Sequence, residues 1–174
     1  MMRDKVFYFI FFLLLLALSR VIPHPPNFTP ILATSIMAPL LMKDRIYGIA
    51  LPILAVFVSD IIIGFHSYQL AVYFSLLFIS LITPMKKNYL YLGAMAIGGS
   101  LWFYLVTNFA VWSMSSMYPK TIEGILSCYV LALPFLTSTL VSTLIFTILI
   151  AWSSEILKLF NKNFNKFFNI INTN

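Results

Sequence analysis

Asp60 is the side chain with the strongest need for a partner elsewhere in the chain. It lies one turn before the end of an apolar run, where a carboxylate is costly unless a cation pairs with it. Gly64 follows as a plausible left-handed cap, so the carboxylate also faces the unfavourable end of a helix dipole. The candidate cations at the same depth are Arg20, His24, His66 and Lys120. Of these we expect Arg20 to form the pair, which would either tie two helices together or help to hold a ligand.

Both histidines of the chain, His24 and His66, fall in loops next to Asp60. Cys128 is the only cysteine, and none of these groups stands at the spacing of metal ligands on a helix. We therefore expect no metal site. Each ring is predicted either to hydrogen bond a loop carbonyl or to contact a ligand in its neutral form.

A third polar segment begins at Thr107 and contains Asn108 and Trp112. An amide beside aromatic rings is typical of a small-molecule pocket, which is mostly apolar with a few fixed polar groups. Aromatic residues also gather at membrane surfaces, and that alternative accounts for Trp102 and Trp152 but not for Asn108. The chain has no G-x-S-x-G elbow, no phosphate-binding glycine loop and no H-E-x-x-H helix, so we expect neither catalysis nor a cofactor.

Apolar helices must position these side chains. The chain has 174 residues, of which 61% are hydrophobic and 9% charged, and this composition excludes an ordinary soluble domain. We predict an all-α integral membrane protein, with residues 1–174 forming a single transmembrane domain of six helices. The predicted spans are about 6–22, 28–42, 47–63, 68–83, 90–112 and 124–153.

The charge distribution predicts the orientation of these spans. Nine of the eleven basic residues fall at the termini and in the second and fourth loops: Arg3, Lys5, Lys43, Arg45, Lys86, Lys87, Lys158, Lys162 and Lys166. By the positive-inside rule, this side is the cytoplasm, and both termini lie there in the plasma membrane. The formal net charge of +6 therefore has an explanation that involves no nucleic acid.

Prolines shape the loops and interrupt the spans. Three prolines between positions 23 and 26 make the first outer loop a rigid, extended turn. Pro134 predicts a short outer helix, from about Thr121 to Leu133, before the last crossing. Residues 154–174 are predicted to form an amphipathic helix on the inner leaflet, or a frayed polar tail. The first span also resembles a signal peptide, but we expect it to be retained.

Four segments carry a resemblance to a known group of proteins: residues 23–30 (PHPPNFTP), 59–66 (SDIIIGFH), 107–112 (TNFAVW) and 118–119 (YP). They resemble the signatures of a family of small bacterial membrane proteins, which in turn is similar to the substrate-binding S components of energy-coupling factor vitamin transporters. The resemblance implies an S-component-like bundle that binds its ligand near the outer face and docks on a transmembrane coupling subunit driven by ATPases. The first span lacks the Ala-x-x-x-Ala docking pattern of S components, so a solitary transporter or another partner stays open.

We therefore expect a lipid-embedded protein that captures a small organic nutrient, of the vitamin or vitamin-precursor class, at its outer face. The predicted binding residues are Arg20, His24, Asn27, Asp60, His66, Asn108 and Trp112. The alternative is a scaffold subunit that binds another membrane protein through its outer loops and the glycine-rich fifth span.

Overall fold

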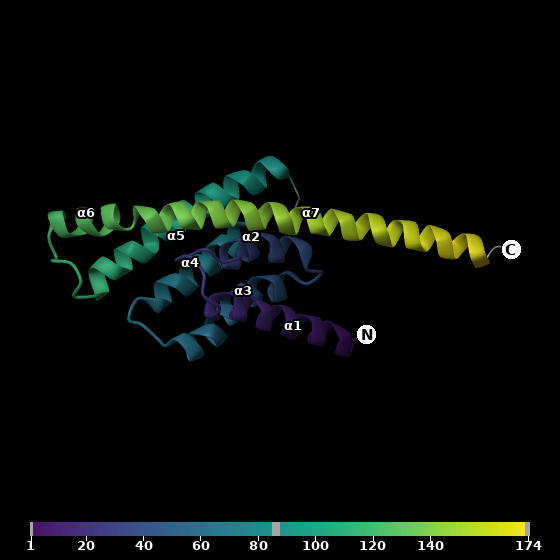
Figure 1. The fold of residues 1–174 in the computed structure, drawn as a ribbon, viewed down its shortest axis with the longest axis horizontal. Helices are drawn as coiled ribbons and strands as arrows, with labels where there is room; N and C mark the ends of the chain where they lie inside the picture. Colours follow the sequence, from purple (N-terminus) through teal and green to yellow (C-terminus); the bar gives the residue numbers. More distant parts are fainter. Residues whose placement is uncertain (1, 85–87, 173–174) are drawn as a thin grey trace.

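The computed structural model describes residues 2–84 and 88–172, and the side chains of residues 6–84 and 88–157. This part of the chain contains seven α-helices and no β-strand, which confirms the all-α class. The helices are α1 (Met2–Val21), α2 (Ile31–Leu41), α3 (Arg45–Ile63), α4 (Gln69–Ile82), α5 (Tyr89–Met114), α6 (Ile122–Leu131) and α7 (Leu133–Asn172). They run back and forth along one axis, and both termini lie toward the same end of the molecule (Figure 1).

Short polar side chains begin three of the helices. Asp44, Asn88 and Thr121 each accept a hydrogen bond from a backbone N–H two or three residues later, at 3.0, 2.9 and 3.2 Å. Such caps satisfy N–H groups that have no partner within the helix. At the other end of α3, Gly64 has a φ of 108° and its N–H bonds to the Asp60 carbonyl at 2.8 Å, which confirms that a glycine with positive φ ends the helix, although its ψ of 151° lies outside the left-handed helical region.

The break before the last long helix also agrees with the sequence. α6 ends at Leu131 and α7 begins at Leu133, which places Pro134 in a first turn, where its missing N–H costs nothing. α7 then continues without interruption to Asn172, so the tail is not a separate element up to that residue. The side chains from position 158 onward lie outside the described residues, and their predicted contact with lipid stays a prediction.

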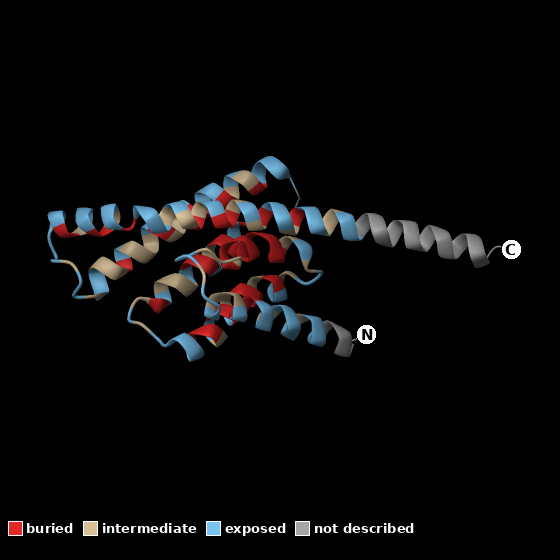
Figure 2. Cartoon of the chain, in the orientation of Figure 1, coloured by how far each residue is buried: buried red, intermediate tan, exposed pale blue. Residues whose placement is uncertain are grey.

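The helix α2 forms the centre of the molecule. It is buried from Ile31 to Pro39 and contacts α3, α4, α5 and α7. Figure 2 shows the buried residues concentrated on α2 and on the faces that surround it, while the outward faces are exposed. Many exposed residues are large and apolar, such as Phe11, Leu15 and Ile62. An apolar outer surface of this kind suits a lipid environment.

Three helices are long and apolar enough to cross a membrane: Arg45–Ile63, Tyr89–Met114 and Leu133–Leu157. The shorter apolar helices are Val6–Val21, Ile31–Leu41, Gln69–Ile82 and Ile122–Leu131. The 11 residues of α2 extend about 16 Å at the rise of an α-helix, which is well short of a hydrocarbon core. The helix also begins three residues later and ends one residue earlier than the predicted span 28–42.

Candidate ligand-binding site

An ion pair joins the ends of α1 and α3. Nη1 of Arg20 donates to Oδ1 of Asp60 at 2.6 Å, which confirms the predicted pairing. The same nitrogen also bonds to Ser59 Oγ at 2.5 Å and to the Val56 carbonyl at 3.1 Å. Asp60 is 1% exposed. Because a buried carboxylate without a cation is strongly destabilising, Arg20 compensates the charge at this end of α3.

The second carboxylate oxygen of Asp60 is held from α4. Gln69 Nε2 donates to Asp60 Oδ2 at 2.6 Å, and the Tyr73 hydroxyl donates to the same oxygen at 2.8 Å. Gln69 also hydrogen bonds Tyr73. Neither Gln69 nor Tyr73 is among the predicted binding residues. Their signal was present, because a glutamine and a tyrosine four positions apart share one helix face, opposite a carboxylate that needed donors.

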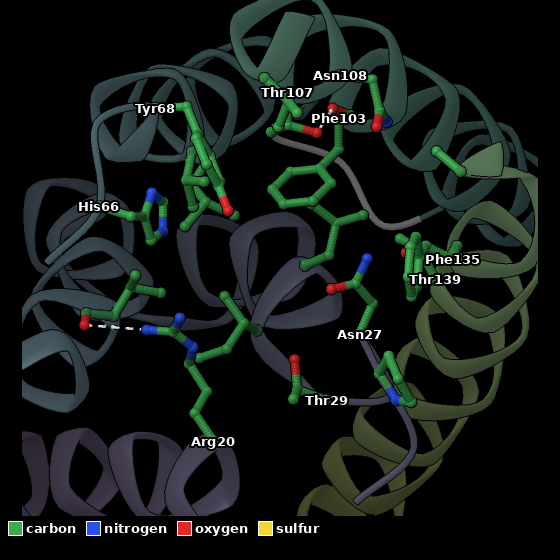
Figure 3. A pocket seen from close by; sticks show the side chains of 18 of the residues that line it. Arg20, Asn27, Thr29, His66, Tyr68, Phe103, Thr107, Asn108, Phe135 and Thr139 are labelled. Atoms are coloured by element: carbon green, nitrogen blue, oxygen red, sulfur yellow. Dashed lines mark hydrogen bonds between the residues drawn. The ribbon is translucent and has the colours of Figure 1, made fainter. Parts of the chain in front are cut away.

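A pocket of about 580 Å³ lies beside this ion pair. Its lining comes from Arg20 at the end of α1, from the loop after α1 and from every helix that follows. Five of the seven predicted binding residues line it, namely Arg20, His24, Asn27, His66 and Asn108. Figure 3 shows polar side chains of distant segments around one central space. A volume in this range is typical of small-molecule sites.

The guanidinium of Arg20 presents a free edge to this pocket. All its hydrogen bonds among the described residues use Nη1. The Nε–H and Nη2–H groups form the other edge of the planar fork and remain open to an acceptor. Figure 3 shows one nitrogen bonded to the backbone and the rest of the group turned toward the interior. Arg20 can therefore neutralise Asp60 and contact a ligand at the same time.

His66 contributes a neutral ring to the pocket wall. Burial lowers the pKa of His66 from its ordinary 6.5; the charge of Asp60 opposes this shift and that of Arg20 adds to it. The ring lies 4.0 Å from that of Tyr68, centroid to centroid, with 31° between their planes. Its Nδ1 atom is buried and has no hydrogen-bond partner among the residues that the structure describes. An orphaned polar atom in a pocket wall is available to a ligand.

The loop between α1 and α2 supplies His24 and Asn27. His24 lies near two backbone carbonyls, with Nδ1 at 2.7 Å from Pro25 O and Nε2 at 3.3 Å from Arg20 O, as predicted for a loop histidine. Asn27 adopts a φ of 60°, a conformation that asparagine tolerates better than most residues. The Ser142 hydroxyl donates to the Asn27 carbonyl at 3.3 Å, which ties this loop to α7.

Asn108 and Trp112 have different positions although both belong to α5. Asn108 lines the pocket and donates its Nδ2–H to the Tyr104 carbonyl at 2.8 Å, and within the described part of the chain no group donates to its side-chain oxygen. Trp112 does not line the pocket: its Nε1–H bonds to Pro119 O at 3.0 Å, and the Lys120 ammonium lies 5.6 Å from the ring centroid. Trp112 thus stabilises the loop after α5.

The side chains that line the pocket are of types suited to binding a ligand. The described residues contain no cluster of three or more His, Cys, Asp or Glu side chains that could hold a metal ion. The pocket instead offers a guanidinium edge, a neutral imidazole, two amides and apolar walls. Groups of these types can bind a small molecule by shape and hydrogen bonds.

Comparison with known proteins places the chain in one family. Searches of curated proteins and of solved structures gave no match. The profile of DUF6580, a family of unknown function, matches residues 2–165, which is nearly the whole chain. The protein with this pocket therefore belongs to the DUF6580 family.

Proposed function

We propose that this protein binds a small organic nutrient at the outer face of the plasma membrane and takes part in its uptake. The observation that carries the proposal is the pocket of about 580 Å³ with its convergent polar side chains. In this proposal α1 to α5 and the α6–α7 unit form six crossings, and the termini face the cytoplasm as the basic residues indicate. The pocket then opens to the outside, where a nutrient is captured.

The proposed transporter resembles S components in having a membrane-embedded site below outer loops. Its energy source depends on whether it has a partner subunit. Either a transmembrane coupling subunit with ATPases docks on it, or it works alone. The exposed face of α1, which carries Phe11, Leu14 and Leu18, is the surface available for such docking. No enzymatic step and no cofactor belongs to this function.

Small molecules that co-purify with the detergent-extracted protein test the proposal. Mass spectrometry should detect a bound compound, and adding that compound at a hundredfold excess over its dissociation constant should stabilise the fold by about 2.7 kcal/mol. Thr107→Val should weaken this stabilisation because Thr107 lines the pocket. Thr137→Val is the matched control, since both hydroxyls bond to the carbonyl four residues earlier but Thr137 is exposed outside the pocket.

One observation favours a scaffold as the second candidate. A Cβ atom added at Gly93 or Gly98 of α5 would meet nothing within 4 Å, so small residues of this helix face outward and could accept another helix closely. A scaffold predicts that Gly98→Leu abolishes co-purification of a protein partner. Complete absence of a bound compound, together with this loss of a partner, would replace transport with scaffolding.

A further inference from the structure

The free edge of Arg20 has the geometry of a receptor for a planar anion. Nε–H and Nη2–H point in nearly parallel directions, and this pair matches the two oxygens of a carboxylate in a bidentate contact. The remaining nitrogen, Nη1, is held by hydrogen bonds to Asp60, to Ser59 and to the Val56 carbonyl. The donor pair is therefore held in place before a ligand arrives, which lowers the entropic cost of binding.

The charges around the pocket limit the anion to one negative charge. Among the described residues that line it, Arg20 is the only lysine, arginine, aspartate or glutamate. The carboxylate of Asp60 already compensates the positive charge of Arg20. A single ligand carboxylate would share one cation with Asp60, whereas a phosphate with two charges would meet stronger repulsion at the same distance.

Other polar groups stand where they can complete the recognition. His66 Nδ1 is buried and unpartnered, and its neutral ring either donates to or accepts from the ligand, depending on the tautomer. Asn108 donates through Nδ2, so its Oδ1 can accept a hydrogen bond from a ligand in the pocket. In Figure 3 both residues lie around the space that Arg20 faces.

The remaining walls suit a flat apolar body. His66 and Tyr68 are packed ring on ring on one side. Phe103 enters the same space from α5, and Val72 and Leu76 of α4 line it as well. Aromatic walls favour an aromatic ring through offset or edge-to-face packing, in addition to the burial of apolar area.

We propose that the ligand is a small aromatic or heteroaromatic monocarboxylate, with its carboxylate on the Nε–Nη2 edge of Arg20 and its ring against Tyr68 and Phe103. This inference rests on the proposed function and names the chemical class of the nutrient. Asp60 is a positioning residue in this arrangement, because it acts through Arg20.

Matched pairs of acid and amide test the carboxylate. The probes are benzoate with benzamide, nicotinate with nicotinamide, and indole-3-carboxylate with indole-3-carboxamide, each titrated against the full-length protein in detergent while its melting is followed. At least one acid should bind about tenfold more tightly than its own amide, equivalent to about 1.4 kcal/mol, because the amide has no charge for the guanidinium. Phenyl phosphate should bind more weakly than benzoate.

Two arginine variants identify the group responsible. Arg20→Lys keeps a cation beside Asp60 but removes the fork, so the preference for the acid over its amide should largely disappear. Arg45→Lys is the matched control, because Arg45 donates to the Leu81 and Thr83 carbonyls at the other end of α3, away from the pocket, and the preference should persist. The comparison of acid with amide in the unchanged protein decides the matter even if Arg20→Lys fails to fold.

Each outcome bears on the proposal. Amides that bind as tightly as acids would overturn the carboxylate and leave small-molecule binding intact. Tighter binding of phenyl phosphate would assign the site to phosphate esters instead. If no acid binds, the inference is wrong, and the mass spectrometry of co-purified molecules then decides separately whether the proposed function survives.

Discussion

Nη1 of Arg20 and Oδ1 of Asp60 lie 2.6 Å apart although 40 positions separate the two residues in the chain. The pair links the last turn of α1 to the last turn of α3, beside the pocket. It therefore has two roles, because it fixes the relative position of two helices and leaves one edge of Arg20 available to a ligand.

Asp60→Ala should destabilise the fold, because a buried ion pair that loses one partner costs about 3–5 kcal/mol. The loss should lie in the lower part of this range, since Arg20 keeps partial access to solvent. Asp60→Asn should cost less because it retains hydrogen bonding. Arg20→Gln should then partly rescue Asp60→Asn. A double-mutant cycle of thermal unfolding in detergent measures the coupling, and strictly additive effects would argue against it.

The hydroxyl of Tyr73 should contribute more to the free energy of unfolding than the hydroxyl of Tyr104. Tyr73 donates to the Asp60 carboxylate, whereas Tyr104 donates to the neutral Tyr129 carbonyl at 2.5 Å. Tyr73→Phe should cost about 1.5–3 kcal/mol and Tyr104→Phe about 0.5–1.5 kcal/mol, because hydrogen bonds to charged groups are stronger. Equal losses in unfolding experiments would show that Asp60 does not depend on its α4 donors.

The contact between α2 and α3 requires glycine at position 48. A Cβ atom there would lie 2.5 Å from the Ala38 carbonyl oxygen, so Gly48→Ala should destabilise the protein by about 1–3 kcal/mol through overpacking. Gly98→Ala is the control, because nothing lies within 4 Å of its Cβ position. That change should be neutral or stabilise α5 by up to about 1 kcal/mol. Melting temperatures of the two variants distinguish a tight interface from a general intolerance of alanine.

Stability should depend on the protonation of His66. Burial lowers the pKa of His66 in the folded protein below 6.5, so the unfolded chain binds more protons as the pH falls below about 6.5. The contribution of the neutral His66 ring to the free energy of unfolding is thus fully present above pH 6.5, and it is lost as the pH falls through the lower pKa of the folded protein. His66→Gln should remove this part of the dependence, which melting curves between pH 5 and 8 would reveal. Identical slopes for both proteins would mean that His66 titrates normally.

Accessibility labelling tests the orientation on which the proposed function depends. In a Cys128→Ala background, cysteines at Ser67 and Ser116 should react in whole cells with a thiol reagent that does not cross membranes, while one at Asn88 should not. All three positions are exposed, so burial does not protect any of them. Labelling at Asn88 alone would place the pocket on the cytoplasmic side.

Much of the candidate site follows from rules that act along the chain. Helix periodicity and Pro134 predict the helices and the break before α7, and Gly64 predicts the end of α3. The cost of a carboxylate in an apolar run predicts that Asp60 needs a cation. These are local requirements of backbone and solvation, and they leave a short set of candidate cations for Asp60, of which the sequence favours Arg20.

Only the tertiary structure decided which groups meet. Gln69 and Tyr73 reach Asp60 because α4 packs on α3, and Asn108 and Trp112 separate because one faces the pocket while the other packs on its own loop. The short α2 lies at the centre because four helices cover it. Such facts depend on the rotation and depth of each helix against its neighbours. Helix packing sets those quantities through many small contacts between residues that are distant in the chain, so one sequence shows which faces are apolar but not which faces meet.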